Sequence, residues 1–235
     1  MERKKRINKL KVFLGVMVIS LLIAISAGIY ILVNNPDILK GNANNEEINN
    51  QNEQKEEEEM LPEDTIINIV GIGDSLCHSQ NFKDAYDSET DTYDFSPMFK
   101  NVTKYVENAT VAVGNLETTL AGKERGYSGY PTFNSPDELA LDLKEMGIDI
   151  LTTANNHCID KGYSGLVSTL DKLDEYGIAH TGTSRSVEEQ NTILFKDLEG
   201  IKTAFLCYTY GTNGIPIPTG KEYCVNLIDK DFMKQ

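Results

Sequence analysis

Short apolar runs alternate with amphipathic stretches along residues 65–235. Runs rich in β-branched residues predict buried strands over 65–72, 109–113 and 149–153. Apolar positions at helical spacing predict helices over 95–108, 137–146 and 163–176. Strands that alternate with helices are typical of an α/β layered domain with a mainly parallel sheet, and we expect that fold class here.

Glycines and a turn mark the ends of the later elements. Gly147 and Gly177 follow the last two predicted helices, as is common at helix C-termini. Two further β-rich runs, 192–196 and 202–208, flank a turn signal at 199–200. We therefore predict a β-hairpin after the alternating part of the chain.

The N-terminal residues differ from this pattern. Residues 12–33 contain no charged side chain and are long enough for a transmembrane helix, which needs about 20 apolar residues. The basic side chains of residues 1–11 precede the span, so the positive-inside rule places the N-terminus in the cytoplasm. We predict a single-pass cell-membrane protein with an extracellular body. The alternative is a cleaved signal peptide, with small residues such as Ala24 and Ala27 near the cleavage site.

Charge separates the remaining segments. Residues 34–64 are rich in Glu, Asn and Gln, and predict an acidic disordered linker, because such a sequence buries too little apolar surface to order itself. The body, 65–235, is also acidic, and the whole chain carries a net charge of −14. Since phosphate neutralisation needs a basic face, this balance argues against a nucleic-acid partner.

Polar side chains follow each of the first three predicted strands. They are Asp74, Ser75, Cys77 and His78 after the first, Asn115 and Glu117 after the second, and Asn155, Asn156, His157 and Asp160 after the third. Because the carboxyl ends of parallel strands meet at one edge of a sheet, we expect these side chains to converge. Carboxylate, imidazole and amide ligands together suit divalent Mn, Zn or Fe.

Each of these residues also has a purely structural interpretation. Asp74 can cap a turn, and two adjacent asparagines, Asn155 and Asn156, can hold a left-handed turn. Glu117 and Asp160 can be solvated acids at helix starts. The two histidines near the strand ends can be hydrogen-bonded packing residues, and for the third, His180, we favour a structural role.

Several runs resemble CapA-type poly-gamma-glutamate capsule synthesis proteins, over essentially all of 65–235. They are IVGIGDSLCHS, AVGNLETTLAG, FNSPDELALDLKEMGIDILTTANNHCIDKGYSGLVSTLDKLDEYGIAHTGT and IKTAFLCYTYGTNG. Proteins of this family are similar to calcineurin-like metallophosphoesterases, so the resemblance implies a metallophosphoesterase-like layered α/β/β/α sandwich. Family members continue further, with more histidine motifs, which implies that only the N-terminal part of the sandwich is present here.

The resemblance also implies roles for individual residues. Asp74 and His78 correspond to the first metal-binding segment, Asn115 and Glu117 lie where the bridging acid is found, and Asn156 supplies an amide ligand. His157 corresponds to the catalytic histidine. Two divalent ions, Mn, Zn or Fe, would activate water for phosphoester hydrolysis. One departure is that Asn115 stands where the phosphoesterases carry an aspartate.

The function implied by the resemblance is that of a membrane-anchored extracytoplasmic protein of capsule biosynthesis or export, with a metallophosphoesterase-type metal site. Its expected partners are the membrane, capsule synthase or export proteins and an anionic polymer. The alternatives are a non-catalytic scaffold of the capsule machinery and an inactive fragment. The cysteines leave open a Cys207–Cys224 disulfide and thiol catalysis by Cys77 or Cys158.

Overall fold

The computed structural model describes residues 64–231 and residue 233, which belong almost entirely to the second of two compact units, Thr65–Gln235. The predicted segments 1–11 and 12–33, and all but the last residue of 34–64, lie outside the described residues. Among the helices of the described part, none is both long and apolar enough to cross a bilayer.

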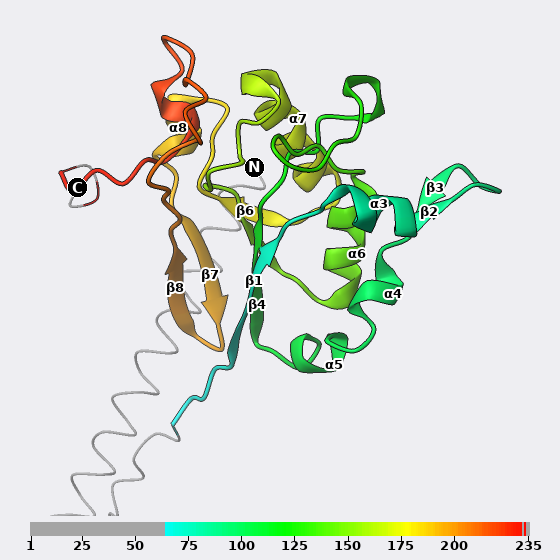
Figure 1. The fold of residues 1–235 in the computed structure, drawn as a ribbon. Helices are drawn as coiled ribbons and strands as arrows, with labels where there is room; N and C mark the ends of the chain where they lie inside the picture. Colours follow the sequence, from blue (N-terminus) through cyan, green and yellow to red (C-terminus); the bar gives the residue numbers. More distant parts are fainter. Residues whose placement is uncertain (1–63, 232, 234–235) are drawn as a thin grey trace, which may run out of the picture. The chain divides into compact units, whose positions relative to one another are not determined.

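A four-stranded parallel sheet forms the centre of the body, in the order β1-β4-β5-β6 (Figure 1). The strands are β1 (Ile69–Ser75), β4 (Val111–Leu116), β5 (Ile150–Thr152) and β6 (Ala179–Thr181). The prediction of a mixed α/β body with a parallel sheet is therefore confirmed, and the arrangement fits a metallophosphoesterase-like fold. The sequence pattern missed β6, because its three residues, Ala-His-Thr, carry little apolar signal.

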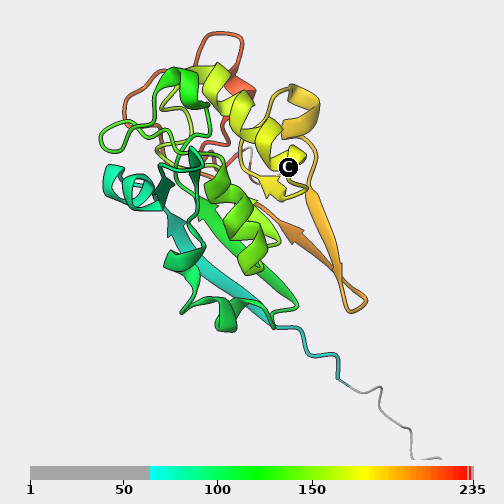
Figure 2. The same cartoon turned by 90° about the vertical axis from the view of Figure 1, so that its right-hand side faces the viewer.

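Two amphipathic helices cover one face of the sheet, α6 (Glu138–Met146) and α7 (Gly162–Glu175), as Figure 2 shows. Leu143 and Leu170 are completely buried on the inner sides of these helices, in one cluster with Leu151 of β5. Gly147 ends α6 with φ of 114°, a left-handed conformation that favours glycine. Both helices thus match the predicted ones to within a residue at each end.

The opposite face of the sheet receives the predicted hairpin. Strands β7 (Leu194–Leu198) and β8 (Ile201–Phe205) pair antiparallel around a turn at Glu199 and Gly200 (Figure 1). Leu198 packs with Val111 and Ile150 in a second, smaller apolar cluster. The hairpin is attached to the sheet through this cluster.

The connection between β1 and β4 contains short elements. These are α3 (Ser79–Ala85), β2 (Tyr86–Asp87), β3 (Thr92–Tyr93), α4 (Ser96–Phe99) and α5 (Thr103–Val106). The single helix predicted over 95–108 is wrong, because the chain turns at 100–102, where Asn101 favours a turn over a helix interior. The break lets Phe99 and Val106 both pack toward the core while Val102 stays 44% exposed.

The remaining elements are short and lie at the carboxyl end of the sheet. They are the 3-10 helices η2 (Lys123–Arg125) and η3 (Glu222–Cys224), and the helix α8 (Val187–Gln190). Isolated bridges, Thr183 with Val225 and Thr209 with Leu227, hold the last described segment against the body.

Candidate functional site

A bulge in β1 determines where the first site residue lies. The β1–β4 register shifts between Gly71 and Asp74, and Gly73 has φ of 73°. A side chain at residue 73 would strain this left-handed backbone, so glycine permits the bulge. After the shift, Asp74 pairs with Asn115 of β4 at the carboxyl end of the sheet.

Asn115 connects three strand ends through its amide group. Its Nδ2 donates to Asp74 Oδ1 at 2.8 Å. Its Oδ1 accepts from Asn155 Nδ2 at 3.1 Å and from Thr152 Oγ1 at 3.2 Å. An aspartate at residue 115 would lack the donor that Asp74 receives here, which gives the substitution of Asn for Asp a physical role in this chain.

Glu117 follows β4 and lies within hydrogen-bonding reach of Asp74. Burial raises the pKa of Glu117, and the charge and hydrogen bond of Asp74 raise it further. Two carboxylates thus lie close together, and the charge of Asp74 disfavours ionisation of Glu117. The pair is therefore more stable with a bound proton or cation than with both carboxylates ionised and nothing bound.

His157 forms a hydrogen-bonded dyad with Asp160. The imidazole Nδ1 lies 2.7 Å from Asp160 Oδ2, and the two side chains are 9% and 0% exposed. Asp160 Oδ2 also accepts the backbone N–H of Phe133 at 2.7 Å, whereas its buried Oδ1 has no partner. A carboxylate on Nδ1 fixes the ring orientation and leaves Nε2 for proton transfer. Asn213 Nδ2 lies 3.4 Å from that Nε2.

The ring of Phe133 separates the two histidines near the site. It meets His157 edge-on at 4.7 Å between ring centroids and His78 at 5.0 Å. The next residue, Asn134, is fully buried and donates to Gly122 O and Gly126 O, which holds this loop in place. Phe133 is thereby a fixed wall of the site.

The structure brings together four of the predicted residues: Asp74, Asn115, Glu117 and His157. His78 caps the start of α3, and its ring contacts the same Phe133 ring that His157 contacts. Asn156 makes no side-chain hydrogen bond to another described residue. The ligand roles of His78 and Asn156 stay predictions.

Four further residues complete the site and were not given these roles from the sequence: Phe133, Asn155, Asp160 and Asn213. Asn155 belongs to the hydrogen-bond network, with Nδ2 2.8 Å from Leu116 O and Oδ1 accepting from His157 N at 3.0 Å. Asp160 is a buried partner of His157 instead of a solvated acid. An acid three residues after a histidine was the available signal for it.

The donor atoms fit a cation only in part. Asp74 and Glu117 provide two adjacent carboxylates that form no ion pair with a Lys or Arg of the described residues, which suits a divalent ion. Within residues 64–231, however, no group of three or more His, Cys, Asp and Glu side chains is arranged to hold a metal. The described residues therefore provide two carboxylate ligands in place and no third.

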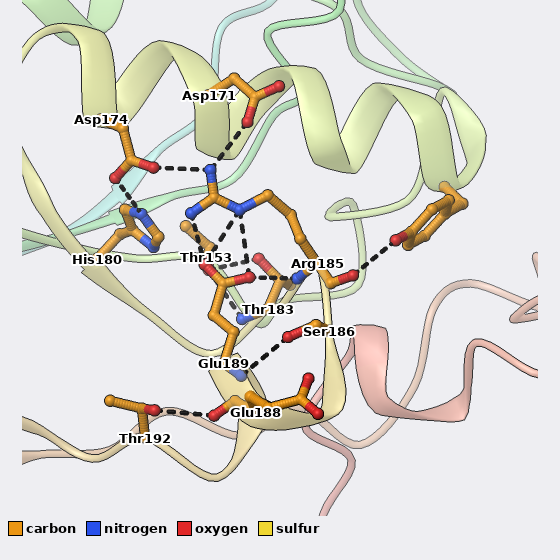
Figure 3. Close-up of polar contacts among 11 residues, drawn as sticks. Thr153, Asp171, Asp174, His180, Thr183, Arg185, Ser186, Glu188, Glu189 and Thr192 are labelled. Atoms are coloured by element: carbon orange, nitrogen blue, oxygen red, sulfur yellow. Dashed lines mark hydrogen bonds and ion pairs between the residues drawn. The ribbon is translucent and has the colours of Figure 1, made fainter.

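A second polar cluster, centred on Arg185, lies beside α7 (Figure 3). Arg185 Nη1 lies 2.8 Å from Asp171 Oδ1 and 2.6 Å from Asp174 Oδ2, and Nη2 lies 2.6 Å from Glu189 Oε1. His180 Nε2 bonds the other oxygen of Asp174 at 3.0 Å. Every acid of this cluster contacts a basic side chain, which supports the structural role expected for His180.

The cysteines are free thiols in the described structure, including Cys207 and Cys224. Cys158 is close enough to Cys224 for the two to interact electrostatically. Burial raises the pKa of Cys158 to about 12, so the thiolate that nucleophilic catalysis requires is disfavoured at neutral pH. Burial likewise raises the pKa of Cys77.

Comparison with known proteins places residues 68–228 in a family model described as "Bacterial capsule synthesis protein PGA_cap". The chain is 25% identical over 116 residues to "Capsule biosynthesis protein CapA" of Bacillus anthracis, an alignment that covers 48% of this chain and 28% of that protein. It is 37% identical over 97 residues to "Uncharacterized protein y4sH" of Sinorhizobium fredii, covering 38% of this chain and 21% of the relative. The alignments thus span about a quarter of these relatives.

Proposed function

This chain belongs to the bacterial capsule synthesis protein family PGA_cap and is CapA-like, and from that premise we propose that its body is a metal-dependent phosphoester hydrolase of capsule biosynthesis or export. The observation that carries the proposal is one arrangement: the Asp74–Glu117 carboxylate pair beside a buried His157–Asp160 dyad. Electrostatic interaction links the two, because Glu117 is close enough to sense both His157 and Asp160.

Asp74 and Glu117 would hold a divalent ion, Mn, Zn or Fe, with Asn115 orienting Asp74 through its amide. A bound ion supplies a Lewis acid and lowers the pKa of a coordinated water. His78, Asn115 and Asn156 remain predicted ligands, and a second ion remains a prediction with them. The proposal needs only that the two adjacent carboxylates bind one cation.

His157 is the residue proposed to move the proton. Asp160 accepts from Nδ1–H and holds the ring so that Nε2 faces the loop that contains Asn213. In this position Nε2 can donate a proton to the leaving oxygen of an ester and take one back from water. Since Asp160 is buried at 0% exposure and also binds Phe133 N, the ring has little freedom to turn away.

The wider setting is part of the same proposal. Residues 12–33 are proposed to anchor the protein in the cell membrane, with the body outside and 34–64 as tether. The finer fold is proposed to be a layered α/β/β/α sandwich, with β7 and β8 belonging to the second sheet. Capsule synthase or export proteins and an anionic polymer of the poly-gamma-glutamate type are the proposed partners.

The test is a hydrolysis assay on the full chain in membranes, with p-nitrophenyl phosphate and bis-p-nitrophenyl phosphate as substrates and added Mn²⁺ or Zn²⁺. We expect turnover that EDTA removes and that Asp74→Asn abolishes. Asp174→Asn is the matched control, because it neutralises an acid of the Arg185 cluster outside the site. Equal turnover in the wild type and Asp74→Asn, or turnover unaffected by EDTA, would overturn the proposal.

A further inference from the structure

A cavity of about 490 Å³ lies between β1 and the short helices α4 and α5. In the described sheet, β1 is an outer strand paired only with β4, and α6 contributes Leu139 and Met146 to the wall of the cavity. The predicted helix 95–108 is split into α4 and α5, and both short helices contribute lining residues, Met98 and Phe99 from α4 and Tyr105 and Val106 from α5. Its volume is within the range of small-molecule sites.

The lining of the cavity is strongly asymmetric. Apolar side chains line most of it, among them Ile72, Phe95, Met98, Phe99, Val102 and Leu139. Asp74, Ser75 and Asn81 are polar lining side chains at the carboxyl end of β1 and on α3, and Tyr105 adds a phenol on α5. The amino half of β1 contributes Val70 and Gly71, and residues 102–106 contribute Val102, Tyr105 and Val106. The cavity is therefore a mainly apolar slot, and its one carboxylate, Asp74, lies at the carboxyl end of β1.

The end of the slot at Asp74 is shared with the candidate site. Asp74 lines the cavity and also accepts the hydrogen bond of Asn115 next to Glu117. A ligand whose body fills the slot would thus present its head at the carboxylate pair. Met98 and Val102 are 40% and 44% exposed, so the slot is open to solvent along α4 and α5.

We propose that this slot binds the linear apolar chain of an amphiphile, a long-chain alkyl or prenyl phosphate ester, and places its phosphoryl head at Asp74 and Glu117. This inference rests on the proposed phosphoester hydrolysis and names its substrate class. In the reaction, the oxygen of water bonds to phosphorus, the bond from phosphorus to the chain oxygen breaks, and that oxygen leaves as an alcohol with the proton from His157. The attacking water loses one proton, which returns to His157, and keeps the other on the phosphate that is released.

The lining favours an apolar chain over a polar polymer. A polyglutamate or peptide segment in the slot would leave its amide groups without partners against Phe95, Phe99 and Leu139, which is costly. An alkyl chain has no such groups and gains from the burial of apolar surface. Asp74, Ser75 and Asn81 group three hydrogen-bonding side chains at one end, which suits a ligand with a single polar head, while the phenol of Tyr105 is 67% exposed and can be hydrated.

The test is photocrosslinking in membranes that carry the full chain. The probe is dodecyl phosphate with a diazirine near the chain terminus, and labelled residues are mapped by mass spectrometry. We expect labels on α4 and α5 that excess dodecyl phosphate removes and butyl phosphate does not. Val102→Glu should reduce the labelling at least about tenfold, because it buries an unpaired carboxylate against the chain.

Val187→Glu is the matched control, because residue 187 is 50% exposed, similar to residue 102, and lies outside the cavity. Val187→Glu should keep full labelling. If Val102→Glu fails to fold, Met98→Glu takes its place and should show the same loss of labelling. Equal labelling of Val102→Glu and Val187→Glu, or labels confined to residues 1–63, would overturn the inference. Hydrolysis of p-nitrophenyl phosphate without slot labelling refutes the slot alone, whereas labelling without any hydrolysis refutes the proposed function.

Discussion

The body contains two polar clusters that use similar side chains in opposite ways. At the Arg185 cluster, hydrogen bonds from Arg185 and His180 outweigh burial and lower the pKa of Asp174 (Figure 3). At the strand ends, burial and the neighbouring Asp74 raise the pKa of Glu117. The acids of the first cluster form ion pairs with Arg185 or His180. Within the described residues no Lys or Arg forms an ion pair with Asp74 or Glu117, and the effect of His157 on the pKa of Glu117 is smaller than the effects of burial and Asp74.

This difference indicates a structural role for the Arg185 cluster and a ligand-binding role for the Asp74–Glu117 pair. A compensated cluster is complete in itself and stabilises the fold, so it connects α7 to the segment before α8. A pair of acids without a basic partner costs stability and persists where a ligand supplies the missing charge. The comparison is what distinguishes Asp74 and Glu117 from the many other acids of a chain with a net charge of −14.

The largest effect is expected from the dyad. His157→Gln should lower phosphoester turnover by about 10² to 10⁴ fold, the usual contribution of a general acid or base. His180→Gln should leave turnover unchanged, because His180 bonds Asp174 in the other cluster. Steady-state kinetics on both variants measure this contrast, and an equal loss in both would remove the distinction between the clusters.

Removal of the Arg185 guanidinium should mainly lower the free energy of unfolding. Arg185→Met leaves Asp171, Asp174 and Glu189 without their partner and should cost about 2 kcal/mol, less than a fully buried pair because Arg185 is partly exposed. Lys123→Met is the control, since it breaks the exposed pair with Asp91 and should cost clearly less stability than Arg185→Met. Urea unfolding of the full chain gives both values, and equal costs would contradict the comparison.

Neutralising one acid in each cluster should give opposite signs. Glu117→Gln should slightly stabilise the protein at pH 7 while it lowers turnover, because a raised pKa means that ionised Glu117 opposes folding. The gain should vanish as pH falls through the folded pKa, where Glu117 is already protonated. Glu189→Gln should destabilise, since Arg185 lowers the pKa of Glu189 against the opposing effect of burial. Destabilisation by both substitutions in urea unfolding would contradict this prediction.

The smallest effect is the acid dependence of the Arg185 cluster. Because the folded pKa values of Asp174 and Glu189 are lowered, their contribution is complete above the unfolded pKa values of about 4 and is lost as pH falls through the folded ones. The stability difference between wild type and Arg185→Met should therefore shrink from pH 6 to pH 2. A difference that stays constant over this range would show that Arg185 stabilises by packing instead of charge.

Most of the fold followed from local patterns. The helices α6 and α7, the glycine stop at Gly147 and the hairpin around Gly200 were predictable because period and turn chemistry are encoded within a few residues. β6 was missed because three residues give too little signal. The break at 100–102 was missed because Asn101 alone is a weak turn signal, and the packing of both Phe99 and Val106 adds to it.

The proximity of some candidate site residues could also be predicted from the sequence, for a geometric reason. Parallel strands align their carboxyl ends, so Asp74, Asn115, Glu117 and His157 had to meet once the sheet formed. The supporting residues depend on contacts that no local pattern encodes. Asp160 is fixed by Phe133, 27 residues earlier in the chain, and Asn213 reaches His157 across 56 residues.

The most direct test of the uncompensated pair is calorimetric titration of the full chain with Mn²⁺, in the wild type, Glu117→Gln and Glu189→Gln. The account predicts saturable uptake by the wild type, loss of that uptake in Glu117→Gln, and full retention in Glu189→Gln. No uptake by the wild type, or the same uptake by all three proteins, would contradict it.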